Sequence, residues 1–414
     1  MKWKEVRLGE VCSRVCSGGT PKSTNLSYYG GEIPWLNTKE IDFNRIYSTE
    51  KTITESGLSN SSAKWIVPNT VTVAMYGATA GKSCIVKVPM TTNQACCNLT
   101  INEEVADYEF VYYTLKNDYT TLASLANGGA QQNLNAQIIK DYVLQMPSLA
   151  DQHRIAAILS SLDWKIELNN KINADLEEMA QAIFKNWFVD FEPFKDGKFV
   201  DSELGMIPEG WKVSQIADIP HILETGKRPK GGAVEKGIPS VGAEHVKGMC
   251  AYDYSKTKYI TPDFAAKLKT GKIEGYELMI YKDGGKPGYF IPNFSIFGEG
   301  YPFRECYLNE HVFKLDFNRD KGFNIFCYFF FKTDVIMSYF NSQGAKAAIP
   351  GINKKDVENI YILSPENEAV KEFGKFALPL FEQMLKNAVE NRTLSLLRDT
   401  LLPRLMSGEL EVSE

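Results

Sequence analysis

The sequence has few features of membrane, disulfide-bonded or metal-binding proteins. Its longest apolar run, residues 325–331, is much shorter than the roughly 20 residues that span a bilayer, and residues 1–10 contain no apolar signal core. The eight cysteines form no C-x-x-C pair and the four histidines are scattered, which favours reduced thiols over a metal site. We therefore expect a soluble, cytoplasmic protein without a metal.

The motifs of enzymes that act on DNA are also missing. There is no Asn/Asp-Pro-Pro-aromatic tetrapeptide, no convincing glycine-rich cofactor loop after a strand, no helicase motor and no obvious nuclease cluster. The nearest candidate is the loop from Gly77 to Ser83. It has three residues between its glycines where a phosphate-binding Walker A loop has four. These absences predict a non-catalytic chain that carries no cofactor.

A strong positive charge is lacking as well. The formal net charge is −5, which argues against a general nucleic-acid binder. The acidic excess is concentrated in residues 149–209 and 366–414, whereas residues 210–365 are mildly basic and residues 1–148 are neutral. Any affinity for DNA must therefore come from local contacts or from partner subunits.

What the sequence does contain is a long internal duplication. Short motifs recur in the same order, at an offset of 205–208 residues early in each copy and 218 late in each copy. The matched residues are Trp3 with Trp211, Ile33 with Ile238, Gly77 with Gly284, Asn135 with Asn353 and Pro147 with Pro365. A repeat of this length predicts two whole domains.

Each copy ends in a heptad pattern, which is typical of a long helix that packs against another. One seam position is taken by Ile155, Leu162, Asn169, Leu176 and Ile183, and 218 residues later by Phe373, Leu380, Asn387, Leu394 and Leu401. A second position, three residues further on, is taken by Ile158, Ile172, Met179, Phe376 and Leu397.

An asparagine stands in the middle of each apolar seam, at Asn169 and Asn387. A polar residue there costs stability but fixes the register if it bonds another amide. We predict that the two helices pack against each other with these asparagines near the crossing. The alternative is two separate core helices, one on each domain.

The segments before these helices predict mixed domains. Short β-rich runs occur at residues 70–75 and 277–281, and helical spacing of apolar residues occurs at 107–125 and 324–340. We predict an α+β chain with an internal pseudo-twofold repeat and two similar globular domains, each followed by a long helix, the helices pairing as a coiled coil. The expected parts are 1–148 (first domain), 149–190 (first helix), 191–209 (linker), 210–365 (second domain) and 366–414 (second helix).

Loops rich in hydrogen-bonding side chains occur at the same places in both copies. Asn and Gln can bond adenine, and Arg and Lys can reach guanine or phosphate, although each such residue alone could equally be a turn former or a solvated group. The two copies place these loops at matching positions but fill them with different residues. One scaffold that reads two different DNA sequences would show this pattern. The candidate DNA-binding residues are Lys22, Trp35, Asn37, Tyr76, Thr79, Lys82, Asn93, Gln94, Gln131, Gln132, Thr225, Lys227, Arg228, Lys230, His245, Lys286, Gln343 and Lys346.

Several of these motifs together resemble a known family. They are YGATAGK at 76–82 with NQA at 93–95, GAQQNLN at 129–135, the helix start with Pro147, Gln152 and Ile155, the junction LGMIPEGW at 204–211, and LLRDTLLPRLMSGE at 396–409. On these residues the chain resembles the specificity subunit of type I restriction-modification systems over essentially its full length.

The resemblance implies a division of labour. Members of this family carry two target-recognition domains that each read one half of a bipartite, asymmetric site in double-stranded DNA. The paired helices separate the domains and dock methyltransferase (M) subunits, of which two are expected, and restriction (R) subunits join the full complex. S-adenosylmethionine is then bound by the methyltransferase partner, where adenine is flipped and methylated.

The same resemblance gives the helices the role of a ruler. Residues 155–187 would extend roughly 50 Å as a helix, which exceeds the roughly 34–36 Å of one DNA turn. We expect whole-turn insertions or deletions to change the unread gap and to leave each half-sequence intact.

The second copy departs from the family pattern, because it lacks the Gln-Gln of the first late loop and has a weak helix start at residues 364–368. Three alternatives remain. The chain could be an orphan or exchangeable specificity subunit that serves methylation only, a single-chain methyltransferase, or a coiled-coil scaffold with no role on DNA. The missing catalytic motifs argue against the methyltransferase.

Overall fold

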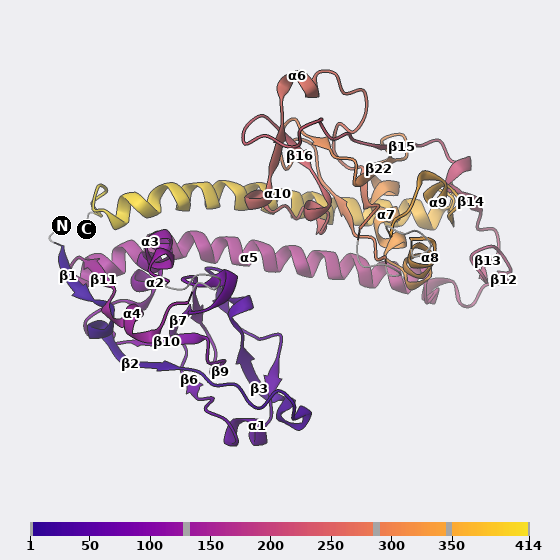
Figure 1. Cartoon of the computed structure of the whole chain (residues 1–414). Helices are drawn as coiled ribbons and strands as arrows, with labels where there is room; N and C mark the ends of the chain where they lie inside the picture. Colours follow the sequence, from indigo (N-terminus) through magenta and orange to yellow (C-terminus); the bar gives the residue numbers. More distant parts are fainter. Residues whose placement is uncertain (1–2, 127–132, 285–289, 345–349, 413–414) are drawn as a thin grey trace. The chain divides into compact units, whose positions relative to one another are not determined.

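The computed structural model describes residues 3–126, 133–284, 290–344 and 350–412 (Figure 1). The chain forms two compact units. Unit 1 comprises Met1–Lys165 and Leu394–Glu414, and unit 2 comprises Ile166–Thr393. Unit 1 is thus built from both ends of the chain. Within the described ranges, every helix is too short or too polar to cross a membrane.

Unit 1 is built on two sheets and a separate strand pair. The first sheet has the order β2 (Cys12–Ser17), β10 (Cys96–Ile101), β7 (Val71–Ala74), β8 (Ser83–Val86) and β4 (Arg45–Ile46). The second has the order β5 (Thr52–Ile53), β3 (Tyr29–Leu36), β9 (Met90–Thr92) and β6 (Trp65–Ile66), and β1 (Lys4–Arg7) pairs with β11 (Val143–Met146). Every residue of β7 and β8 is buried, and β7 lies within the β-rich run at residues 70–75.

Short helices complete the domain of unit 1. They are η1 (Leu8–Val11), η2 (Leu26–Tyr28), η3 (Thr38–Glu40), α1 (Glu55–Ser59), η4 (Gly77–Thr79), α2 (Tyr108–Asn117), α3 (Tyr119–Ser124) and α4 (Ala136–Asp141). The helix predicted at 107–125 is interrupted, because Asp118 ends α2 and begins α3. Asp107 caps α2 by accepting a hydrogen bond from the backbone N–H of Phe110.

Unit 2 repeats the sheet arrangement of unit 1. Its main sheet has the order β15 (Ile222–Thr225), β22 (Val312–Asp316), β19 (Leu278–Tyr281), β20 (Phe294–Ile296) and β17 (Gly248–Met249). A second sheet has the order β18 (Lys258–Ile260), β16 (Ile238–Val241) and β21 (Tyr307–Leu308), and β14 (Val213–Gln215) pairs with β23 (Tyr361–Leu363). The match of β15-β22-β19-β20-β17 to β2-β10-β7-β8-β4 confirms the duplication.

The helices of unit 2 include a strongly apolar one. Its short helices are η5 (Glu192–Phe194), η6 (Ile216–Asp218), η7 (Ala243–His245), η8 (Tyr254–Lys256), α6 (Pro262–Ala265), α7 (Lys321–Phe331), α8 (Asp334–Gly344) and α9 (Lys354–Glu358). Nine consecutive residues of α7 are buried. The segment predicted as a linker contains η5 and the hairpin of β12 (Phe199–Val200) with β13 (Ile207–Pro208).

Two long helices, α5 (Leu149–Phe188) and α10 (Glu368–Met406), contribute to both units. In unit 2 they run antiparallel, because Asn169 bonds Asn391 while Asn173 bonds Asn387 (Figure 1). Together with the repeated sheets, this pairing confirms the predicted α+β fold class with its coiled coil.

The second seam position was predicted one residue too early. Ile158, Met179, Phe376 and Leu397 are 38%, 50%, 37% and 45% exposed, so their assignment to the seam is wrong. Residues four positions after the first seam position are buried instead, among them Leu159, Ala180, Ala377, Met384 and Leu405. Steps of three and four residues both lie close to one helical turn of 3.6 residues. Packing against the neighbouring domain decides which of the two steps gives a buried side chain.

Aromatic packing holds the long helices to the domain of unit 2. The ring centroid of Phe184 on α5 lies 5.5 Å from that of Phe326 and 6.0 Å from that of Phe329, both on α7. It also lies 5.5 Å from the ring of Phe373 on α10. In unit 1 the corresponding contacts are aliphatic, since Leu402, Leu405 and Met406 of α10 join the domain's core.

Candidate nucleic-acid interface

Four loops of unit 1 meet along one edge of its sheets. The backbone N–H of Gly19 donates to the carbonyl of Thr92 at 2.8 Å, and that of Asn93 donates to the carbonyl of Leu36 at 3.0 Å. The hydroxyl of Thr79 donates to the carbonyl of Thr38 at 2.9 Å. The fold therefore brings together the segments around residues 18–22, 35–37, 76–82 and 93–94.

Glycines make this convergence possible. A Cβ on Gly18 would lie 2.1 Å from the carbonyl oxygen of Thr92, and one on Gly19 would lie 2.1 Å from the amide nitrogen of Ala63. Gly77 and Gly81 have φ angles of +80° and +84°, which side chains rarely adopt. The glycine loop at 77–81 is thus a tight turn.

Some candidate side chains of unit 1 face solvent. Tyr76 is 40% exposed, and Lys22 and Gln94 are also exposed. Gln94 is in addition hydrogen-bonded to Thr20. These side chains are the ones that this edge offers to a ligand.

Other candidates of unit 1 hold the loops to one another. The Nδ2 of Asn93 donates to Oδ1 of Asn37 at 3.0 Å, and both side chains are half-buried. Lys82 forms an ion pair with Asp42 at 2.5 Å. To contact DNA, these side chains would have to break their present hydrogen bond or ion pair, or bind DNA while keeping it.

The prediction that Trp35 contacts DNA is contradicted by its burial. Its side chain is 5% exposed, and its ring N–H donates to the carbonyl of Gly19 at 2.9 Å. The ring also packs edge-on against Tyr29. Through its hydrogen bond to Gly19, the buried Trp35 supports the loop of residues 18–22.

The loops of unit 2 meet through the same backbone contacts. The N–H of Asn309 donates to the carbonyl of Val241 at 3.0 Å, as Asn93 does to Leu36 in unit 1. The hydroxyl of Thr225 donates to the carbonyl of Val312 at 2.8 Å, so it holds the base of the loop that follows. Gly226 packs directly on the backbone of Leu308.

Three basic side chains lie on this loop. Lys227, Arg228 and Lys230 are all exposed, and Nη1 of Arg228 lies 3.8 Å from Oε1 of Glu310. Glu310 and His311 belong to the neighbouring loop. The basic loop is thus only partly neutralised by its surroundings.

Three residues near this loop were not predicted. Nδ1 of His311 lies 2.5 Å from Oδ1 of Asp283, and its Nε2 lies 3.2 Å from Oε1 of Glu310. A signal for Glu310 and His311 did exist, because Asn309 aligns with Asn93 and they directly follow it. Asp283 had one too, because it precedes Gly284 as Tyr76 precedes Gly77, but only the fold places it beside His311.

The prediction that His245 contacts DNA is also wrong. The residue has no exposed surface, and its Nδ1 accepts a hydrogen bond from the N–H of Gly242 at 3.1 Å. In unit 1 the carboxylate of Glu40 accepts from Asn37 in the same way, at 2.9 Å. The ring stacks on Tyr252, and burial lowers the pKa of His245. His245 is a capping residue.

The remaining DNA-binding candidates are less informative. Gln343 lies half-buried in the last turn of α8. Gln131, Gln132, Lys286 and Lys346 lie outside the described residues.

The candidate helix-pairing residues line the contact between α5 and α10 to different degrees. Ile155, Phe373, Asn169 and Asn387 are buried, the asparagines at 1% and 5% exposure. The half-buried members are Leu162, Leu176, Ile183, Leu380, Leu394 and Leu401.

Asparagines of the two helices are cross-linked by hydrogen bonds. Nδ2 of Asn169 donates to Oδ1 of Asn391 at 2.9 Å and to Oε2 of Glu390 at 2.8 Å. Nδ2 of Asn387 donates to Oδ1 of Asn173 at 2.8 Å. Each seam asparagine therefore bonds an amide on the opposite helix, although the two do not bond each other.

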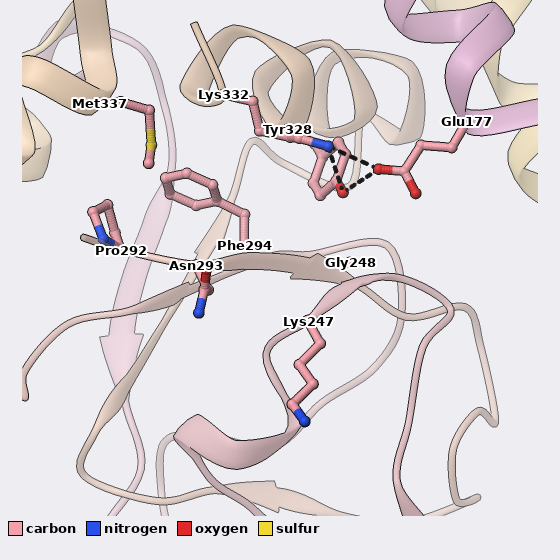
Figure 2. A pocket seen from close by; sticks show the side chains of 9 residues that line it. All are labelled: Glu177, Lys247, Gly248, Pro292, Asn293, Phe294, Tyr328, Lys332 and Met337. Carbon is pink, nitrogen blue, oxygen red and sulfur yellow. Dashed lines mark hydrogen bonds and ion pairs between the residues drawn. The ribbon is translucent and has the colours of Figure 1, made fainter. Parts of the chain in front are cut away.

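A hollow of about 390 Å³ lies in unit 2 beside α5 and α7, and Figure 2 shows its lining. The carboxylate of Glu177 on α5 accepts hydrogen bonds from the hydroxyl of Tyr328 at 2.6 Å and from Nζ of Lys332 at 2.8 Å. Because both partners lie on α7 or directly after it, this contact fastens α5 to the domain. Lys247 and Asn293 lie elsewhere on the wall.

The cysteines show no sign of chemical activity. All eight are free thiols, and six of them are buried. Burial raises the pKa of Cys12 and of Cys97 to about 12, so these thiols stay protonated and poorly nucleophilic. Within the described ranges, no group of three or more His, Cys, Asp or Glu side chains is placed to hold a metal ion.

The fold and its loops define a duplicated protein, in which two α+β domains with similar scaffolds and different loops are attached to a pair of antiparallel helices. A family model for the type I restriction modification DNA specificity domain matches residues 1–178. The chain is 30% identical over 428 residues to the MjaIX type I restriction enzyme specificity subunit of Methanocaldococcus jannaschii, covering 100% of this chain and 94% of that protein. The chain belongs to the family of type I restriction enzyme specificity subunits.

Two further relatives agree with this assignment. The HindI specificity subunit of Haemophilus influenzae is 23% identical over 372 residues, which cover 75% of this chain and 79% of that protein. The crystal structure of a type I restriction-modification S subunit from M. genitalium matches with a TM-score of 0.58 at 18% identity, covering 98% and 96% of the two chains. That structure supports the fold.

Proposed function

We propose that this chain is the DNA-reading subunit of a type I restriction-modification complex and that it recognises a bipartite, asymmetric site. The domain of residues 1–148 reads one half-sequence and the domain of residues 210–365 reads the other. The segments 149–190 and 366–414 form the spacer between the readers, and 191–209 links the two copies. The ligand is double-stranded DNA.

One observation carries this proposal. The two domains share the order of their main sheets and the backbone bond that joins Asn93 to Leu36 in one copy and Asn309 to Val241 in the other. The side chains held on that common frame differ, with Tyr76 and Gln94 in unit 1 and Lys227 and Arg228 in unit 2. Two domains that share a backbone scaffold but carry different loop side chains can recognise different DNA sequences.

The chain itself supplies recognition, and its partners supply the chemistry. S-adenosylmethionine would be held by methyltransferase subunits, two of which dock on the helices, and cleavage would belong to restriction subunits in the full complex. Exposed apolar side chains on the helices support such docking. In unit 2 they include Leu168 and Val389, at 52% and 48% exposure, and in unit 1 Trp164 and Leu396, at 43% and 61%. The complex would work in the cytoplasm, where the DNA is.

The test is to co-express the chain with the methyltransferase subunit encoded beside it in a host free of DNA methylation. Adenine methylation is then mapped across the genome at base resolution. A two-part motif with a fixed gap, present only with this chain, is the expected result. A stable complex that produces no such motif would refute the reading function and favour the scaffold alternative.

The same experiment separates the two DNA-related alternatives when the restriction subunit is added. Loss of unmethylated plasmid would show a restricting system. Methylation without such loss would show a subunit that serves methylation only.

A further inference from the structure

One ion pair breaks the likeness between the two long helices. In unit 1, Oδ1 of Asp163 on α5 lies 2.7 Å from Nη1 of Arg398 on α10, and the side chains are 9% and 17% exposed. Shifting these positions by the 218-residue repeat gives Phe381 on α10 and Ala180 on α5. Both are buried in the apolar core of unit 2, at 1% and 3% exposure. Equivalent positions thus hold an ion pair in one unit and apolar residues in the other.

The surroundings keep this pair charged. The hydroxyl of Tyr113 donates to Oδ2 of Asp163 at 2.7 Å. Burial alone would raise the pKa of Asp163, but the charges of Lys116 and Arg398 outweigh it and hold this pKa below its ordinary value. Arg398 also bonds its neighbour Asp399 at 2.8 Å. Asp163 is therefore compensated by Lys116 and Tyr113 of its own domain and, across the helix pair, by Arg398.

The asparagine cluster behaves in the opposite way. Asn169 bonds Asn391, and Asn173 bonds Asn387. The 218-residue repeat converts Asn169 into Asn387 and Asn173 into Asn391, so it exchanges these two bonds. Two copies of α5, or two copies of α10, could form these two amide bonds, so the bonds fix the register of a helix pair without choosing its partner. The bond from Asn169 to Glu390 has no such counterpart, because the repeat places Ile172 where Glu390 stands.

The size of the side chains near the C-terminal end of each long helix is a second difference. Phe184 and Phe188 of α5 pack among the aromatic rings of α7. Their repeat equivalents on α10, Leu402 and Met406, are buried in unit 1. Placing α5 where α10 belongs would force two rings into space shaped for aliphatic side chains, which overpacks the core.

We propose that Asp163 and Arg398 determine which helices pair, so that α5 joins α10 and rejects the same helix of a second copy. In a pair of two first halves Asp163 would face Ala180, and in a pair of two second halves Arg398 would face Phe381. Either arrangement breaks this ion pair: Asp163 would keep only Tyr113 and Lys116 of its own half, and Arg398 would keep its neighbour Asp399. Removing one member of a largely buried ion pair is unfavourable. This proposal concerns assembly and does not depend on DNA reading.

The test uses the full chain with a protease site inserted at the exposed residues 195–198 and cleaved after folding. Cleavage gives a first half that carries α5 and a second half that carries α10. Isotopically light and heavy preparations are mixed and warmed until light and heavy wild-type halves have exchanged. Native mass spectrometry then separates pairs of a first with a second half from like pairs, which contain two first halves or two second halves. For the wild type we expect first–second pairs and no more than a small share of like pairs, which sets the baseline.

The decisive variant is Asp163→Phe with Arg398→Ala, which installs in unit 1 the apolar pair of unit 2. We expect the share of like pairs to rise at least about tenfold, because the unpaired buried charges are gone. A matched control, Glu372→Ala with Lys375→Ala, removes an exposed ion pair of α10 and should behave as the wild type. Equal shares of like pairs in wild type and decisive variant would overturn the proposal.

A second variant covers the case in which the first does not fold. Asp163→Arg with Arg398→Asp keeps the ion pair with its signs exchanged. When this variant is cleaved and mixed with cleaved wild type, pairs that combine halves of different origin place like charges together. They should be depleted at least about tenfold. Formation of these mixed pairs at the statistical share would refute partner choice by this ion pair.

Discussion

The basic loop of unit 2 provides the sharpest test of DNA reading. Lys227, Arg228 and Lys230 are exposed on one short loop, and among them Arg228 has a carboxylate, Glu310, 3.8 Å away. Replacing the three basic residues by alanine should remove up to three phosphate contacts and weaken binding of DNA by the complex with its methyltransferase partner.

The size of the effect follows from counterion release. Each phosphate contact contributes about 0.9 to the slope of log affinity against log salt, so three contacts contribute about 2.7. Between roughly 50 and 200 mM salt, the wild-type affinity should therefore fall about 40-fold more than that of the triple variant. Because Glu310 partly neutralises Arg228, a change of slope nearer 2 is also consistent with the structure.

Fluorescence anisotropy with a labelled duplex, at several salt concentrations, measures this slope. The matched control replaces Lys185, Lys195 and Lys198, which are exposed on α5 and the segment after it, and causes the same change of net charge. An unchanged slope in the loop variant, or an equal change in the control, would refute the assignment of this loop to DNA.

Four further predictions concern the helices. Arg398→Ala should lower the free energy of unfolding in urea by up to about 3–5 kcal/mol, since it removes the ion-pair partner of Asp163 and leaves only Lys116 and Tyr113; a loss below about 1 kcal/mol would contradict this. Because the pKa of Asp163 is lowered from 3.8, its stabilisation is present at neutral pH and is lost as the pH falls below about 4, so Asp163→Asn should flatten stability against pH there. Phe184→Ala should cost about 3–5 kcal/mol in the unfolding of unit 2, measured by urea titration. Inserting seven residues at facing positions beside Asn173 and Asn387 adds about 10 Å, so methylation mapping should show a gap longer by about three base pairs and unchanged half-sequences.

The parts of the fold that the sequence predicted are those governed by local pattern. Strands β7 and β19 consist mainly of apolar residues, and they lie where the β-rich runs at 70–75 and 277–281 predicted strands. The long helices begin within two residues of the expected starts, and they end two and eight residues before the expected ends at 190 and 414. The break at Asp118 was missed because one aspartate serves as the end of α2 and the start of α3.

The errors arise where distant segments decide the outcome. Trp35 and His245 have the side chains expected of a DNA contact, but strand pairing and loop closure bury both. The heptad pattern allows the second seam position to follow the first by three or by four residues. Only packing against the domain shows which of the two positions is buried. The ion pair of Asp163 with Arg398 joins residues far apart in the chain, so no local pattern could indicate it.

The division of unit 1 between the two ends of the chain has a consequence for its synthesis. The core around Phe110 is completed by Leu402, Leu405 and Met406, and Gly408 lies against the ring of Trp3. These last residues leave the ribosome only after the whole of unit 2, roughly tens of seconds after the first domain at ordinary translation rates. During that interval the first domain presents an apolar face that its own chain cannot yet cover. A nascent or truncated chain is therefore the form most exposed to chaperones, proteases and aggregation.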